Sequence, residues 1–231
     1  MWRLFAAIAA ACIALLAWPE AVAFLRWQRG VSGAWGVFSD GECWRMLSAH
    51  FVHLGAWHAL ANLAGLALVI ECLGAWTRPD EALAMMLVSA LAIIAGLAMR
   101  DPAVGWYAGL SGVVHGLWAG CALLGWLRQS RRRSESDSQG DRQGNGQGNR
   151  QADKRADKRA DKPRAGARQL RFGLPAAACG VLVLKLMLPP LPWLAAASGL
   201  PVVPQSHWYG ALAGAIVALA LFAGSSHDAM Q

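Results

Sequence analysis

Six long apolar stretches constrain this chain more than any other feature of its sequence. They cover residues 4–25, 56–76, 83–99, 110–127, 172–188 and 207–223. Each is about long enough to cross the roughly 30 Å hydrocarbon core of a bilayer as a helix. Charged residues make up only 15% of the chain, whereas soluble domains usually carry about a quarter. We therefore predict an all-α membrane protein, a bundle of six transmembrane helices.

A cleaved signal peptide is the alternative interpretation of the first stretch. We disfavour it because the stretch is long, contains Pro19 and Glu20, and has no small-residue cleavage site before Arg26. The five cysteines predict neither a disulfide framework nor a metal site, since no CxxC spacing occurs among them.

The basic charge is concentrated between residues 128 and 171. This segment holds 14 Lys and Arg against 6 Asp and Glu, a net charge of +8, whereas the rest of the chain has 7 against 8, a net charge of −1. It contains the repeat "ADKRADKRADKP" and is too polar to bury a core, which predicts a disordered linker. Binding of nucleic acid or a calmodulin-like partner is an alternative that we disfavour. Arg131–Arg133 are candidates for contact with anionic lipid headgroups.

The positive-inside rule places this basic linker in the cytoplasm. The linker joins the fourth and fifth apolar stretches, so both chain termini are expected to be cytoplasmic, and residues 26–55, 100–109 and 189–206 form outer loops. The expected organisation is one domain in three parts. Residues 1–127 hold helices one to four with the outer loop 26–55, residues 128–171 form the linker, and residues 172–231 hold helices five and six.

Polar side chains occur at one membrane depth in three of the apolar stretches. His58 and Asn62 share a helix face near the outer end of the second stretch. Ser111 and His115 do the same in the fourth, and His207 begins the sixth. Polar groups in hydrocarbon are costly unless they are used, so this arrangement indicates a functional site. Interhelical hydrogen bonding without catalysis is the alternative.

Glycines supply a way for two of these helices to meet. Close helix contacts in membranes favour small residues, and Gly112, Gly116 and Gly120 line one helix while Gly210 and Gly214 line another. Packing along these rows would bring His207 within about 2.6–3.2 Å of the Ser111 hydroxyl, as an activated serine requires. His58, Asn62 and the backbone N–H of Ser111, at a helix start, are candidate donors to an oxyanion.

At these residues the chain resembles the rhomboid intramembrane serine proteases, over roughly residues 44–224. "WRMLSAHFVHLGAWHALAN" carries the Trp44-Arg45 pair with His53, His58 and Asn62 at the spacing of that family. "GLSG", residues 109–112, is similar to the catalytic GxSG motif, and "HWYGALAG", residues 207–214, to the HxxGxxxG pattern of the last span. The resemblance implies a rhomboid-like fold with Ser111 as nucleophile and His207 as base, and with Gly109, Gly112, Gly210 and Gly214 in supporting positions.

One position departs from the usual pattern. Typical rhomboids carry a tyrosine four residues after the serine, where this chain has His115. "GLSGVVHGL" resembles the rhombosortase branch, which implies substrates with a C-terminal Gly-Gly sorting tail containing a single span. Whether His115 stacks on His207, hydrogen-bonds near it or competes as a base is open from the sequence.

The expected activity is hydrolysis of peptide bonds in membrane-anchored proteins, near the outer face of a bacterial inner membrane. No Asp or Glu is positioned to complete a triad, because Glu20 and Glu71 lie in other spans. Trp44, Arg45 and the "PPLPW" loop, residues 189–193, are candidates for shaping the mouth of the site. We expect no cofactor, no metal and no nucleic-acid partner.

Two other classes of function remain as alternatives. A catalytically silent relative would bind membrane-protein clients without cutting them. A metal site or transporter would use His50, His53, His58 and His115, but this set lacks carboxylates and thiolates, and the chain has no HExxH motif of zinc proteases.

Overall fold

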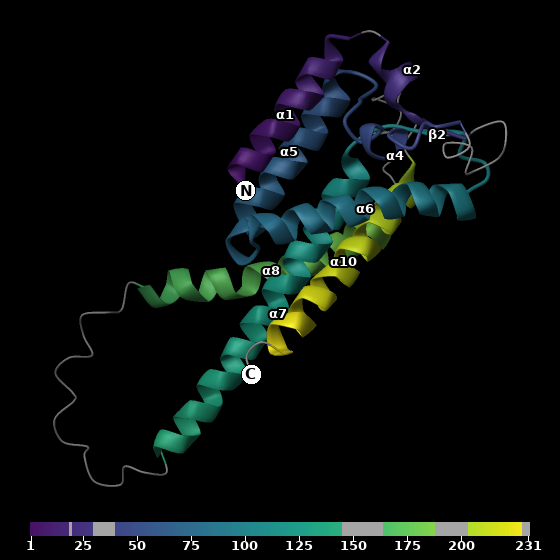
Figure 1. Ribbon diagram of the computed structural model, residues 1–231. Coiled ribbons are helices and arrows are strands. Elements are labelled where there is room, and N and C mark those ends of the chain that lie inside the picture. Colours follow the sequence, from purple (N-terminus) through teal and green to yellow (C-terminus); the bar gives the residue numbers. More distant parts are fainter. Residues whose placement is uncertain (19, 30–39, 145–163, 188–202, 228–231) are drawn as a thin grey trace.

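Long helices make up most of the structure, a computed structural model that describes residues 1–18, 20–29, 40–144, 164–187 and 203–227 (Figure 1). A pair of two-residue antiparallel strands, β1 (Trp27–Gln28) and β2 (Trp106–Tyr107), joins two of the connections. The helices are α1 (Trp2–Leu16), α2 (Ala21–Leu25), α4 (Arg45–Ser48), α5 (Ala56–Leu73) with the 3-10 turn η1 (Gly74–Trp76), α6 (Pro79–Arg100), α7 (Ser111–Gly144), α8 (Arg164–Met187) and α10 (Pro204–His227).

Three helical segments in the described part of the chain are long and apolar enough to cross a membrane. They are Ala56–Trp76, Pro79–Arg100 and Pro204–Ser225, and Trp2–Leu16 and Gly173–Met187 are shorter apolar helices. Large apolar side chains such as Trp57, Leu68 and Leu212 are more than half exposed, as expected for helix faces that contact lipid. The count of six spans stays a prediction.

The first predicted span is not one continuous helix. The apolar stretch 4–25 is divided into α1, which ends at Leu16, and the short helix α2, which starts at Ala21. Proline disfavours helical geometry in the residue before it, so Pro19 in the sequence explains why the first helix stops early.

The segment predicted as a linker from residue 128 begins as a helix instead. α7 continues to Gly144, and α8 starts at Arg164, so residues 145–163 of the predicted linker lie outside the described residues. The first part of the segment has tertiary partners that polarity alone does not reveal. Arg128 hydrogen-bonds to the Trp76 carbonyl at 2.7 Å and to the Glu81 carboxylate at 2.6 Å, and the Arg131 guanidinium lies 4.0 Å from the centre of the Phe222 ring.

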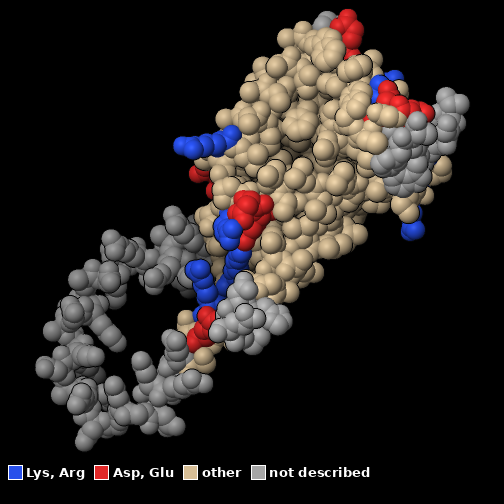
Figure 2. All heavy atoms as spheres, in the orientation of Figure 1, with Lys and Arg blue, Asp and Glu red and all other residues tan. Residues whose placement is uncertain are grey.

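Four parts of the chain meet at one end of the bundle, where Arg128 and Arg131 make these contacts. Met1 lies beside Gly74, so the start of α1 meets the turn between α5 and α6, and Phe222 brings the last part of α10 to the basic part of α7. The β1–β2 pair and α4 lie at the opposite end (Figure 1). Charged side chains gather toward the two ends on the face in Figure 2, with an uncharged belt between them.

At the opposite end of the bundle, Arg45 holds the connections between helices together. Its guanidinium donates to the carbonyls of Ala23 and Arg26 at 3.3 and 3.1 Å, pairs with Glu42 at 2.9 Å and lies over the Trp44 ring. These bonds hold α4 against the end of α2. The carbonyl of Ala49, just after α4, then accepts a hydrogen bond from the Gly109 N–H at 2.9 Å. The chain entering α7 is therefore fixed to the preceding connection.

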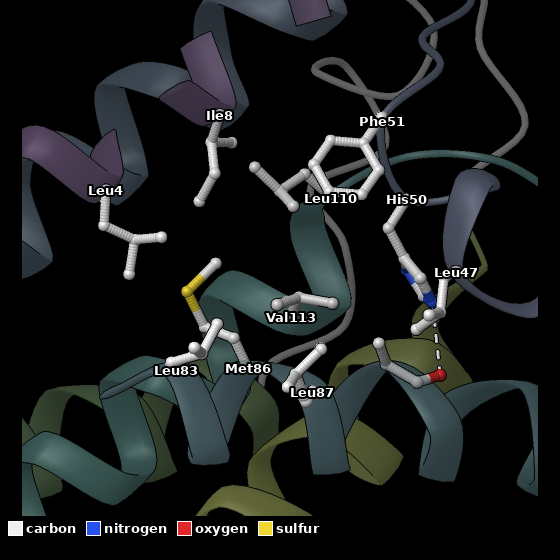
Figure 3. Close-up of a pocket in the computed structure, with 11 residues that line it drawn as sticks. Leu4, Ile8, Leu47, His50, Phe51, Leu83, Met86, Leu87, Leu110 and Val113 are labelled. Atoms are coloured by element: carbon white, nitrogen blue, oxygen red, sulfur yellow. Dashed lines mark hydrogen bonds between the residues drawn. The ribbon is translucent and has the colours of Figure 1, made fainter. Parts of the chain in front are cut away.

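A cavity of about 110 Å³ lies between α1, α4, α6 and the start of α7 (Figure 3). Its wall is apolar except for His50, whose Nε2 donates to the Ala90 carbonyl at 3.1 Å. Leu110 and Val113 line it, but Ser111 and the predicted catalytic partners do not. The cavity therefore lies behind the start of α7 and contributes no reactive group.

Candidate active site

The turn that presents Ser111 depends on the glycine two residues before it. Gly109 has φ +122°, a conformation that side chains other than glycine rarely adopt. A Cβ atom there would also lie 2.9 Å from Cε1 of His58. The hydroxyl of Tyr107 donates to the Gly109 carbonyl at 2.8 Å and fixes the turn from the other side. Ser111 then begins α7 with its side chain partly exposed.

The two predicted glycine rows lie in direct contact. A Cβ atom added to Gly210 would overlap the Gly112 carbonyl oxygen, and one added to Gly214 would overlap that of Gly116. At Gly120 an added Cβ would lie 2.9 Å from the Gly214 carbonyl oxygen. The backbones of α7 and α10 are therefore packed together along this row, with no room for a Cβ atom at Gly210 or Gly214.

This close approach brings the two predicted reactive groups together. Nε2 of His207, in the first turn of α10, lies 3.1 Å from Oγ of Ser111, at the start of α7. The two residues are 96 positions apart in the sequence. The contact has the length expected between a serine nucleophile and its base.

His115 lies beside this pair and answers the question left open by the sequence. Its ring stacks on that of His207, with the centroids 4.2 Å apart and an interplanar angle of 17°. Its Nδ1 donates to the Ser111 carbonyl at 2.6 Å, and its Nε2 contacts Nζ of Lys185. Both ring nitrogens are thus engaged away from the serine hydroxyl, which leaves His207 as the imidazole that faces Oγ.

One predicted oxyanion donor, His58, lies against the serine turn at Gly109. Nδ2 of Asn62 and Nδ1 of His58 are buried and have no hydrogen-bond partner in the described structure. Nε2 of His58 lies against the Gly109 backbone, where a Cβ atom would approach it to 3.1 Å. A buried amide donor without a partner is costly, so the Asn62 amide on α5 keeps the capacity to donate one more hydrogen bond.

Histidines around this turn favour the neutral state. His53 packs edge-on against His58, with the ring centroids 5.0 Å apart, and its Nδ1 donates to the Phe51 carbonyl at 3.2 Å. Burial, with a smaller contribution from His58, lowers the pKa of His53 to about 4. Burial likewise lowers the pKa of His50 to about 4. Both rings therefore act as uncharged packing groups at neutral pH.

The other residues that the sequence predicted for the site lie in different places. Arg45 holds the connection before α4, and Trp44 packs against Phe24 with the ring centroids 5.0 Å apart. The "PPLPW" loop lies outside the described residues. The four histidines that a metal site would have used do not form one group, since His53 contacts His58 whereas His115 contacts His207. Among the described residues, no three potential ligands come together in a metal-binding geometry.

Sequence reasoning missed Lys185 on α8. Its amine contacts Nε2 of His115 and lies 3.4 Å from Nδ1 of His207. The signal was present in the run "VLVLKLM", residues 181–187, since one lysine in a stretch predicted to span the membrane marks a functional position by default.

Comparison with known protein families identifies the part of the chain that carries the site. Residues 40–135 match the family model of the rhomboid domain, which is fewer than half of the 231 residues. Neither curated proteins nor solved structures gave a match. The match includes Ser111, Asn62, His58 and His115, and ends before α8 and α10. The chain is therefore an integral, multi-pass membrane protein that contains a rhomboid domain, the domain of a family whose typical members are intramembrane serine proteases.

Proposed function

We propose that this protein is an intramembrane serine endopeptidase in which Ser111 is the nucleophile and His207 the base. The observation that carries the proposal is the 3.1 Å contact between Ser111 Oγ and His207 Nε2. A hydrogen bond between Ser111 and His207 that only joined the two helices would need neither the free donor of Asn62 nor the glycine-dependent turn before Ser111. The combination of nucleophile, base and unpaired donor favours catalysis.

In the proposed reaction, Oγ of Ser111 attacks the carbonyl carbon of the scissile peptide while its proton passes to Nε2 of His207. Negative charge develops on the carbonyl oxygen, and the Asn62 amide, the His58 ring and the Ser111 N–H donate hydrogen bonds to it. His207 then gives the proton to the leaving amine. Water hydrolyses the acyl-enzyme with His207 again as base, which restores Ser111.

The site lies at the end of the bundle opposite the basic part of α7. By the positive-inside rule the basic end faces the cytoplasm, so the site opens to the outer side and both termini are cytoplasmic. In this proposal α1, α7 and α8 complete the six spans, and the protein resides in a bacterial inner membrane with its site facing the periplasm.

The proposed substrates are single-span membrane proteins that present small residues near the outer face. Unwinding at such residues exposes a backbone carbonyl to Ser111. His115 in place of the usual tyrosine is the feature that favours the rhombosortase branch and substrates with a Gly-Gly tail.

Co-expression with a Gly-Gly-tailed, single-span reporter tests the proposal. Mass spectrometry of the released reporter is expected to give one product whose mass corresponds to cleavage near the outer end of its span. The Ser111→Ala variant, produced in equal amount in the membrane, is the control. If the product has the same mass and yield with that variant, another protease makes it and the proposal is wrong.

The oxyanion role of Asn62 gives a separate prediction. Asn62→Ala is expected to lower kcat by about 100- to 1,000-fold, because removal of one such donor costs that much in serine proteases. KM is expected to change little, since the bond forms only when charge develops. Kinetics of the purified variant in detergent or liposomes measure both constants.

Asn62→Asp is the matched variant, because it keeps the size of the side chain and removes its donors. It should be at least as inactive as Asn62→Ala. Wild-type kcat in either variant would remove Asn62 from the mechanism while leaving the Ser111–His207 pair in place.

A further inference from the structure

Lys185 meets the candidate pair from a third helix. It lies two residues before the end of α8, and its amine contacts Nε2 of His115 and lies 3.4 Å from Nδ1 of His207. Much of the side chain is exposed, so a long lysine near a helix end could have extended toward the membrane interface instead. The amine turns toward the two histidines, which indicates a role in the site.

The hydrogen bonds around Lys185 limit the protonation state of its amine. The Ser111 carbonyl only accepts, so Nδ1 of His115 carries its hydrogen and Nε2 of His115 is an acceptor. Lys185 therefore donates to His115. For His207 to act as base, Nε2 must hold a lone pair facing Ser111, and Nδ1 must carry the hydrogen. That Nδ1–H points to the neighbouring amine of Lys185 and needs an acceptor.

Only an uncharged amine satisfies both histidines. A neutral –NH₂ group has two hydrogens to donate and one lone pair to accept, whereas an ammonium group has three hydrogens and no lone pair. An ammonium group would turn His207 to the tautomer that presents N–H to Ser111. It would also oppose the imidazolium that forms when His207 takes the serine proton.

We infer that Lys185 is a positioning residue of the active site, whose uncharged amine accepts a hydrogen bond from His207 Nδ1–H and donates one to His115. It takes the place that a carboxylate occupies in a Ser-His-Asp triad. No bond is made or broken at Lys185, and the only proton that moves passes between Ser111 Oγ and His207 Nε2. The inference rests on the proposed function, because it concerns the same nucleophile and base.

The geometry predicts a particular dependence on pH. Among the described residues, the titratable side chains that contact Lys185 are His115 on α7 and His207 on α10. Reaction at Ser111 requires both His207 and Lys185 to be uncharged. The pH dependence of the rate should therefore include a rise that belongs to the loss of a proton from Lys185.

Reaction of Ser111 with a fluorophosphonate probe measures this without a known substrate. The rate of labelling is followed against pH in the full-length protein in liposomes, with Ser111→Ala as the blank. Lys185→Gln keeps an uncharged donor and acceptor, so it should react within about tenfold of wild type and lack the rise that belongs to Lys185. Lys185→Met lacks both functions and should be about 100-fold slower. Lys185→Arg is always charged and should be at least as slow at every pH.

Val183→Met is the matched control, since Val183 is an exposed apolar residue of the same helix. It should react like wild type. The inference is overturned if wild type and the Gln variant show the same pH dependence, or if the Met and Gln variants react equally fast. If Ser111 of the folded wild-type protein is not labelled at any pH, the proposed function itself fails, which is a distinct result.

Discussion

Replacing either Ser111 or His207 by alanine is expected to lower peptide-bond cleavage by about 10,000-fold or more, below detection in most assays. Ser111 supplies the only hydroxyl that the structure brings to His207 Nε2 among the described residues, and His207 is the imidazole that faces it. The two groups act as a unit, because the serine is a weak nucleophile without its base. The double variant should therefore be no less active than either single variant.

Cleavage of the Gly-Gly-tailed reporter by the purified variants measures this effect. Both variants should remain folded in the membrane, since neither side chain belongs to the buried apolar core. His115→Ala is the informative comparison. It removes the stacking partner of His207 without removing the base, so partial activity should remain. If His207→Ala kept most of its activity while His115→Ala lost it, the assignment of the base would be wrong.

Gly214→Ala is expected to destabilise the protein by about 1–3 kcal/mol and to reduce cleavage by about 100-fold or more. The added Cβ atom overlaps the carbonyl oxygen of Gly116, which belongs to the backbone and cannot rotate away. α10 must then move from α7 and carry His207 with it. A displacement of about 1 Å between reacting groups is enough for a loss of this size.

Gly224→Ala is the matched control on the same helix. No atom lies within 4 Å of the position that its Cβ would take, and alanine favours helix over glycine by about 1 kcal/mol. Thermal unfolding in detergent should thus show opposite signs, with a loss of stability at Gly214 and no loss at Gly224. Equal stability and activity for both variants would show that the glycine row does not set the distance between α7 and α10.

Local sequence rules predicted the parts of this site that depend on spacing within one helix. The glycines at intervals of four in α7 and α10 predicted the contact between these helices, and the positions of Ser111 and His207 at their starts predicted which side chains meet there. Helical periodicity fixes which residues share a face, so such pairs can be read directly from the chain.

The features that sequence reasoning missed depend on partners distant in the chain. Whether Lys185 turns toward lipid headgroups or toward His115 depends on where α8 packs against α7, and the spacing within α8 does not contain that information. The residues after 127 were predicted to form a linker because their composition is polar. The first part of this segment is held by the Arg128–Glu81 ion pair and by the contact between Arg131 and Phe222, which join residues far apart in the chain.

The most direct test of an activated serine is the site at which a fluorophosphonate becomes attached. After brief labelling of the full-length protein in liposomes, tandem mass spectrometry of its peptides should find the adduct on Ser111 in the wild type. The His207→Ala variant, with its fold verified by circular dichroism, should carry almost none. An unlabelled Ser111 in the folded wild type, or equal labelling with and without His207, would contradict the account.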